Sequence, residues 1–274
     1  PFEAPTLLKG RAMAVFVHEI LGHRMEGHRQ KMEDFGRTFT DKIGQQVVSP
    51  ILTIIDDATL SYFNGEVMRG FYEYDDEGVK SRPVTLVEKG VLKNFLMSSS
   101  PIKNFPASNG HGRGNHYFRP VARMAVTRAL AEQTVTYDEL EKKFLQEIKR
   151  QNKPYGFMIE DLSGGFTMTA TYNPQAFKLE PTLMYRVYPD GRKEVVRGLD
   201  MVGTPQVSFN KVLAAADDYQ VFNGSCGAES GWVPVSAIAP SVLLESMEME
   251  KKQKSTEKPP LLPPPYSLHK GVSK

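Results

Sequence analysis

The stretch VHEILGHRMEGH, residues 17–28, decides the fold that the rest of the chain must accommodate. Apolar side chains recur every three or four residues from Leu8 into this stretch, a spacing that predicts an amphipathic helix. Gly22 interrupts the pattern, and Gly27 favours its end. The sequence therefore predicts a helical segment within residues 8–30 that is disturbed near Gly22.

His18, Glu19 and His23 lie within six residues of one another, and together they suit a metal site. Neutral imidazoles are common zinc ligands, and a carboxylate beside them can accept a proton from a metal-bound water. In the familiar zinc-peptidase pattern H-E-x-x-H, the two histidines are separated by one helical turn. In this chain the second histidine comes one residue later.

The wider spacing of the histidines requires a departure from the regular α-helix. Positions five apart on such a helix diverge by about 140°, so both rings would point away from a common ion. A π-type turn, with i→i+5 hydrogen bonds, brings these positions back toward register. Gly22 lowers the steric cost of that distortion. We therefore expect a π-like bulge or a helix break between His18 and His23.

A catalytic zinc site commonly has three protein ligands and one open position. The candidates for the third ligand are the carboxylates together with His28, His111, His116 and Cys226. Cys226 lies in the Gly/Ser-rich segment 223–231, where we expect a loop that could approach a metal closely. A small, buried apolar cysteine is the alternative interpretation.

The two carboxylates of the motif each have a second interpretation. Glu19 could be a general base or only a hydrogen-bond acceptor for a ligand ring. Glu26 could orient His23 or contact a terminus of the substrate. A salt bridge with Arg29 at the end of the helix is the structural alternative for Glu26.

Residues 106–119, PASNGHGRGNHYFR, lack a hydrophobic period and predict a loop. His111, Arg113 and His116 in this loop are candidate contacts to the backbone or carboxylate of a substrate, because an arginine offers a planar fork of donors. A purely structural loop is the alternative. We interpret Trp232, directly after segment 223–231, as a packing residue.

Strand patterns dominate the remainder of the chain. They cover residues 51–55, 84–87 and 91–97 as a hairpin, 165–172, 183–187 and 233–249. Two further helices are expected, at residues 136–151 behind the capping box of Thr136 and Glu139, and at residues 204–216. The predicted fold class is α+β, a β-rich mixed-sheet domain with a metal-motif helix and one or two further helices.

The composition limits the classes of function and partner. Apolar residues make up 40% and charged residues 24%, and the net charge is only +2, so nothing indicates a nucleic-acid partner. No run approaches the ~20 apolar residues of a membrane span. We expect a domain over residues 1–249 and a Lys/Pro-rich disordered tail over 250–274. Because the chain starts at Pro1 without an initiator Met, we expect it to be the C-terminal portion of a longer protein.

The motif H-E-x-x-G-H-x-x-E-G resembles the signature of the TldD/PmbA metallopeptidases, which are also described as modulators of DNA gyrase. Further blocks resemble this family in the same order over roughly residues 8–249. These blocks are Gly44–Val48, Ile55–Asp57, Asp75–Gly78, Glu88–Leu92, Asn109–Arg113, Arg123-Met124 and Cys226-Gly227.

The resemblance implies the family's C-terminal, metal-carrying domain. Zinc would be held by His18, His23 and Cys226, with Glu19 as the catalytic glutamate. The activity would be hydrolysis of peptides or unfolded protein segments inside a cavity formed by a homodimer or a heterodimer with a family member. A non-catalytic scaffold subunit that pairs with an active homologue is the alternative. The resemblance implies a cytoplasmic protein, and the single cysteine is equally compatible with the periplasm.

Overall fold

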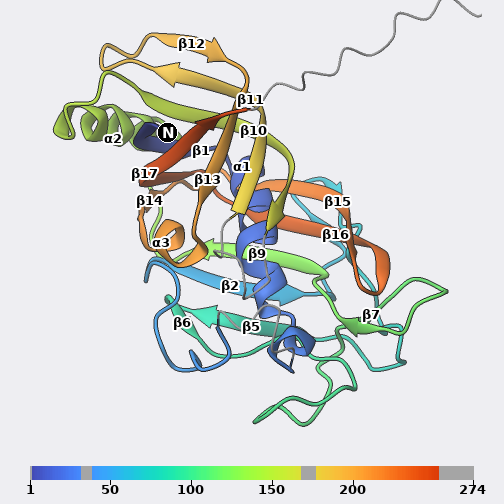
Figure 1. Ribbon diagram of the computed structural model, residues 1–274. Coiled ribbons are helices and arrows are strands. Elements are labelled where there is room, and N and C mark those ends of the chain that lie inside the picture. Colours follow the sequence, from blue (N-terminus) through green and yellow to red (C-terminus); the bar gives the residue numbers. More distant parts are fainter. Residues whose placement is uncertain (1, 32–38, 168–176, 253–274) are drawn as a thin grey trace, which may run out of the picture.

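The computed structural model describes residues 2–31, 39–167 and 177–252, whose strands form two main sheets (Figure 1). The first sheet has seven strands among these residues, in the order β1-β10-β11-β13-β17-β14, with β12 on β11. β1 is parallel to β10 and antiparallel to β17, so part of the sheet closes into a ring. Its strands are β1 Phe2–Leu8, β10 Gly156–Thr167, β11 Phe177–Val187, β12 Lys193–Val196, β13 Leu199–Gly203, β14 Val212–Ala215 and β17 Val242–Lys251.

The second sheet has six strands in the described ranges, in the order β15-β16-β9-β2-β5-β6. Its strands are β2 Leu52–Asp57, β5 Pro83–Glu88, β6 Val91–Leu92, β9 Val126–Ala131, β15 Gln220–Ala228 and β16 Gly231–Ala239. Two short ribbons accompany it, formed by β3 Tyr62–Phe63 with β4 Glu66–Val67 and by β7 Gly112–Arg113 with β8 Val121–Ala122. The predicted hairpin at Lys89-Gly90 joins β5 to β6, and both turn residues have positive φ.

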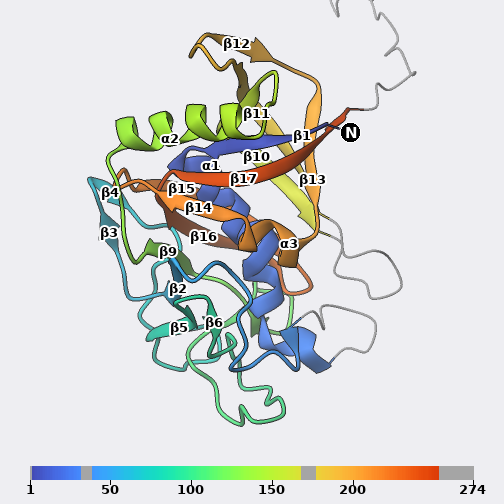
Figure 2. The same cartoon turned by 90° about the vertical axis from the view of Figure 1, so that its left-hand side faces the viewer.

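The motif helix lies between the two sheets. α1, Gly10–Phe16, contacts β1 and β10 of the first sheet and β15 and β16 of the second. Figure 2 shows it descending from the first sheet toward the second. Its side chains from Ala12 to Phe16 are buried in the main apolar core, which also includes residues of both sheets. The helix therefore brings the motif to the junction of the sheets.

Two further helices complete the described part of the chain, α2 Tyr137–Arg150 and α3 Pro205–Asn210. The predicted capping box is present: Thr136 Oγ1 accepts from Glu139 N at 3.3 Å, and Thr136 N donates to Glu139 Oε2 at 3.1 Å. α2 lies across the first sheet in Figure 2. The α+β fold class predicted from the sequence is confirmed. Within the ranges that the structure describes, no helix is long and apolar enough to cross a membrane.

Several local predictions were wrong, including the strand predicted for 91–97, which ends at Leu92 as β6. The motif helix begins at Gly10 because Leu8 belongs to β1, opposite Val242. The helix predicted for 204–216 ends at Asn210, since the following residues pair with β17 as β14. The segment 223–231 is not a loop: up to Ala228 it belongs to β15. The predicted strand 165–172 lies partly, and the predicted tail almost wholly, outside the described residues.

Candidate metal centre

The helix widens between His18 and His23. α1 continues into a π-helix, Val17–Leu21, and then into a 3₁₀-helix, Gly22–Met25. The backbone N–H of Gly22 donates to the carbonyl of Val17, five residues earlier. A Cβ atom at Gly22 would collide with the sulfur of Met124, so a larger residue would force this buried side chain to shift. The predicted π-like bulge is therefore present.

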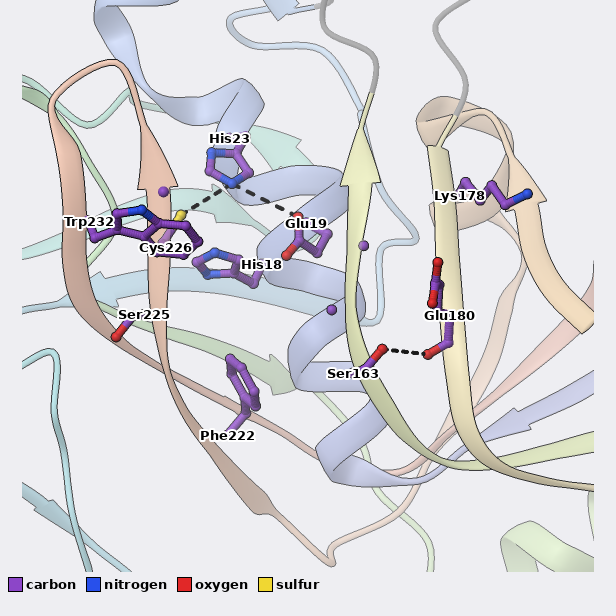
Figure 3. A pocket seen from close by; sticks show the side chains of 13 residues that line it. His18, Glu19, His23, Ser163, Lys178, Glu180, Phe222, Ser225, Cys226 and Trp232 are labelled. Atoms are coloured by element: carbon purple, nitrogen blue, oxygen red, sulfur yellow. Dashed lines mark hydrogen bonds and ion pairs between the residues drawn. The ribbon is translucent and has the colours of Figure 1, made fainter. Parts of the chain in front are cut away.

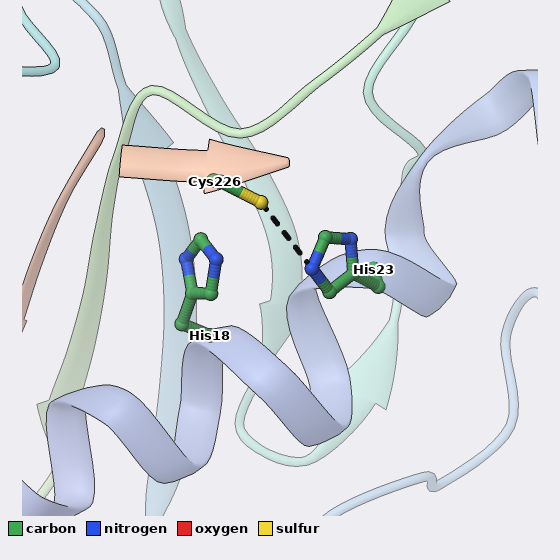
Figure 4. Close-up of side chains that lie close together, drawn as sticks. All are labelled: His18, His23 and Cys226. Carbon is green, nitrogen blue, oxygen red and sulfur yellow. Dashed lines mark hydrogen bonds between the residues drawn. The ribbon is translucent and has the colours of Figure 1, made fainter. Parts of the chain in front are cut away.

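The bulge places both histidines beside Cys226 on β15, a strand far away in the sequence (Figure 4). One potential ligand atom from each of His18, His23 and Cys226 lies within 4.8 Å of the others. Cys226 Sγ is 3.4 Å from His23 Nε2, and the two ring centroids are 5.2 Å apart. All three side chains are buried. Their convergence from two separate elements gives the site its geometry.

The charges within the cluster favour the thiolate of Cys226 and the protonated form of His23. Burial raises the pKa of the Cys226 thiol, but His23 and His18 lower it to about 4. Burial lowers the pKa of His23, but Glu26 and the Cys226 thiolate raise it to about 10. A metal ion would take the place of the proton on His23, because a ligand imidazole binds in its neutral form.

The donor set fits zinc. Two imidazoles and one thiolate match the borderline-soft character of Zn²⁺ and leave a fourth position open. The Nδ1 atom of His18 is buried and has no hydrogen-bond partner among the described residues. An unsatisfied buried ring nitrogen costs free energy, which a ligand beside it could recover.

Glu19 lies next to the cluster on the wall of a cavity of about 480 Å³ (Figure 3). Its side chain is 18% exposed, and its Oε2 atom is 4.0 Å from His23 Nε2. Burial raises the pKa of Glu19, and Cys226 and Glu26 act in the same direction against His18 and His23. A raised pKa brings the carboxylate closer to the range in which a general base is effective.

The cavity has walls from both sheets. β15 and Trp232 line one side together with the cluster, and Ser163 of β10 and Glu180 of β11 line the opposite side (Figure 3). Trp232 is 68% exposed and lies against Gly227, so it packs on the surface of the strand pair and not in the core. The site therefore opens between a helix and two facing strand layers.

Glu26 supports the cluster from behind and does not line the cavity. Its side chain is fully buried, and Oε2 is 3.3 Å from His23 Nδ1. Arg29 Nε donates to the same oxygen at 2.7 Å, so both predicted contacts, with the ring and with Arg29, occur together. Arg29 also forms a two-pronged pair with Glu229 at the turn after β15. Such outer partners fix the orientation of a ligand ring.

Arg123 joins the two elements that carry the ligands. Its Nε forms an ion pair with Glu26 Oε1 at 3.3 Å, and its Nη2 donates to the carbonyl of Cys226 at 2.8 Å. Nη1 donates to Ser230 Oγ at 3.0 Å and to the carbonyl of Gly231 at 3.1 Å. One fully buried guanidinium thus holds the motif segment against the β15–β16 hairpin. The sequence pattern did not reveal this role, because the partners of Arg123 are about 100 residues away.

We expect Arg123→Gln to lower zinc affinity about 10- to 100-fold, the usual cost of losing an outer partner of a ligand. Competition with a chromophoric chelator would measure this. Arg128→Gln is a matched control, since Arg128 pairs with Asp57 on the same sheet, away from the cluster. Unchanged affinity in a folded Arg123→Gln protein would contradict the role.

The other candidate residues lie away from the cluster. His28 faces Glu229, with Nε2 3.6 Å from the carboxylate. His111 is fully buried between Asn109 and Asp56, its Nε2 3.2 Å from Asp56 Oδ1. Arg113 and His116 line a second cavity, and neither of them lines the metal cavity.

Comparison with known proteins supports this description. The family model of the PmbA/TldA metallopeptidase C-terminal domain matches residues 1–251. A metalloprotease of Methanocaldococcus jannaschii is 29% identical over 84% of this chain and 47% of its own length. A zinc metalloprotease TldD homolog of Saccharolobus solfataricus is 22% identical over 90% of this chain and 51% of its own length.

A solved structure described as a modulator of a DNA gyrase, from Thermotoga maritima, has the same fold. Its TM-score is 0.63 at 19% identity, with 91% of this chain and 50% of that chain covered. The π-bulged helix and the facing strand define a β-rich domain with a buried His/His/Cys site. The chain belongs to the PmbA/TldA metallopeptidase family, whose C-terminal domain it matches. It spans about half the length of the curated relatives named above.

Proposed function

We propose that the protein is a zinc-dependent peptidase that hydrolyses peptides or unfolded protein segments. The observation that carries this proposal is the convergence of His18, His23 and Cys226 within 4.8 Å, with Glu19 beside them on the cavity wall. A structural zinc site would not need an open cavity or a neighbouring carboxylate with a raised pKa. The name of the Saccharolobus solfataricus relative also supports zinc.

The residues that line the cavity and those behind it would have different roles in the reaction. Bound Zn²⁺ would act as a Lewis acid on the peptide carbonyl and lower the pKa of a coordinated water. Glu19 would accept a proton from the attacking water and later return it to the leaving amine. Glu26 and Arg123 would hold His23 and the Cys226 strand in place.

The shape of the site favours an extended substrate. β15 is an edge strand of the second sheet among the described residues, and Ser225 and Gly227 beside Cys226 line the cavity. An extended polypeptide can add to such an edge through main-chain hydrogen bonds. This favours peptides and unfolded segments. We further propose, on the family resemblance, a homodimer or a heterodimer with a family member, located in the cytoplasm.

The test is metal analysis and peptide digestion of the full-length protein. We expect about one Zn²⁺ per chain and cleavage of unfolded peptides that stops with a chelator and returns with Zn²⁺. Elemental analysis and mass spectrometry of the digests would measure both. Full zinc with no cleavage of any unfolded peptide would instead favour the scaffold alternative.

A further inference from the structure

A second cavity of about 610 Å³ adjoins the metal cavity. Trp232 lines both, so this exposed indole is the wall that the two cavities share. The second cavity is rich in aromatic side chains, and four of them, Trp232 included, are exposed to solvent. The aromatic members besides Trp232 are Phe71, Tyr72, Tyr74 and Phe118.

Arg113 lines this cavity, and its surroundings are unusual for a buried cation. Arg113 is only 6% exposed, and the Cζ atom of its guanidinium lies 4.8 Å from the centroid of the Tyr72 ring. Nη1 donates to the carbonyl of Met124. No carboxylate of the described residues forms an ion pair with Arg113, in contrast to Arg29 and Arg123. Buried arginines are usually paired, whereas Asp56 and Asp76 act on Arg113 only from beyond ion-pair distance, so no carboxylate contacts its guanidinium among the described residues.

Two donor atoms of Arg113 remain for a ligand. Neither Nε nor Nη2 has a hydrogen-bond acceptor among the described residues, and neither is among the buried polar atoms that solvent cannot reach. Solvent can therefore reach both nitrogens, and Arg113 lines the second cavity. Adjacent guanidinium donors match the two oxygens of a carboxylate.

The acidic residues of the cavity are already engaged. Asp75 accepts three backbone N–H groups, from Glu77, Val79 and Gly112. Asp76 accepts the N–H of Gly114 at 2.8 Å. The two arginines of the cavity, Arg113 and the exposed Arg69, form no ion pair with these carboxylates among the described residues. The free hydrogen-bonding capacity of the cavity thus favours an anion.

We propose that the second cavity binds a carboxylate of the peptide substrate, held by the guanidinium of Arg113, with the aromatic walls against the side chain beside it. This inference rests on the proposed peptidase function. A peptide that crosses Trp232 would place its scissile bond at the metal cluster and its carboxylate on Arg113. Arg113 would then select substrates by an acidic group at a set distance from the cleaved bond. The carboxylate is either the C-terminus of the peptide or an Asp or Glu side chain.

Binding can be tested without cleavage. The chain is kept zinc-free with a chelator and titrated calorimetrically with four matched peptides, which carry a free or an amidated C-terminus and an internal Asp or Asn. Trp232 is the only tryptophan of the chain, so its fluorescence reports whether a peptide reaches the shared wall. We expect the peptides with a carboxylate to bind about 10- to 100-fold more tightly than the amidated Asn peptide. Comparison of the two single-carboxylate peptides identifies the source.

Variants assign the effect to the arginine. Arg113→Gln should remove the preference for a carboxylate and leave binding of the amidated Asn peptide unchanged. Arg113→Lys, which keeps the charge without the planar fork, should retain part of the preference. If Arg113→Gln does not fold, the lysine variant carries the test. Arg192→Gln is the matched control, since Arg192 also stacks on a tyrosine, Tyr188 at 4.1 Å, outside both cavities.

Equal affinity for all four peptides, or an unchanged preference in Arg113→Gln, would overturn the proposal. Carboxylate-dependent binding without a change in Trp232 fluorescence would also overturn it, because the ligand would then lie elsewhere. Binding as expected, in a protein that never cleaves a peptide, would count against the peptidase function and leave this site standing. Cleavage without carboxylate preference would do the opposite.

Discussion

Cys226→Ala should lower the zinc affinity of the protein by more than the ~10- to 100-fold expected from loss of an outer partner such as Arg123. Cys226 would supply the only soft, anionic ligand of the cluster, and two neutral imidazoles alone would form a weak site. The pKa of Cys226, about 4, means that zinc need not displace a proton from sulfur near neutral pH. Elemental analysis after dialysis against a weak chelator would show the loss.

Ser225→Ala is the control for this experiment. Ser225 is the neighbour of Cys226 on β15 and also lines the metal cavity, but it is exposed and offers no thiolate. Its loss should leave zinc content at the parent level. If Cys226→Ala keeps near-stoichiometric zinc with parent-like affinity, a histidine or carboxylate must replace Cys226 as the third ligand.

The parts of the site that the sequence predicted best are those set by local spacing. The separation of His18 and His23 excludes a regular α-turn for two ligands of one ion, and Gly22 marks where the helix can widen. The capping box of α2 is likewise local, because Thr136 and Glu139 satisfy each other's backbone N–H groups. The contact of Cys226 with these histidines required the family resemblance, since spacing alone left several candidates open.

The segment around Cys226 shows why glycine content misled the secondary-structure prediction. Gly224 and Gly227 suggested a loop, yet they belong to β15, which pairs with β16 along its whole length. A Cβ atom at Gly227 would lie 2.9 Å from the ring of Trp232, and one at Gly224 would lie 2.6 Å from Phe222. These glycines leave room for aromatic rings on the strand surface, so their absence of side chains serves packing.

The network behind the cluster could not be predicted from sequence distance. Glu26 was a candidate because it lies one turn after His23. Arg123, between β8 and β9, pairs with Glu26, and Glu229, in the turn after β15, pairs with Arg29, the partner of Glu26. Likewise, the fold separates three residues of segment 106–119 that are close together in the sequence. His111 turns inward to Asp56, whereas Arg113 and His116 line the second cavity. Only the tertiary arrangement distinguishes these three roles.

Glu19→Gln should reduce peptide cleavage about 10²- to 10⁴-fold, the usual contribution of a general base. The amide keeps the size of the side chain and removes the basic oxygen. Glu19 makes no hydrogen bond to His18 or His23 among the described residues, and its Oε2 atom is 4.0 Å from His23 Nε2, so zinc content and fold should persist. We expect kcat to fall while KM changes little, because Glu19 acts on the water and not on the peptide.

The variant Glu180→Gln distinguishes the loss of a general base from the loss of a negative charge in the cavity. Glu180 lies on the opposite wall of the same cavity, about half exposed, and pairs with Lys252 at 2.7 Å. Its replacement removes the same charge from the same space, so cleavage should change less than about 10-fold, as for an exposed ion pair. Equal losses in the two variants would mean that charge alone matters, and parent-like cleavage by zinc-loaded Glu19→Gln would remove Glu19 from the mechanism. The comparison requires full-length protein, because this chain spans about half the length of its curated relatives.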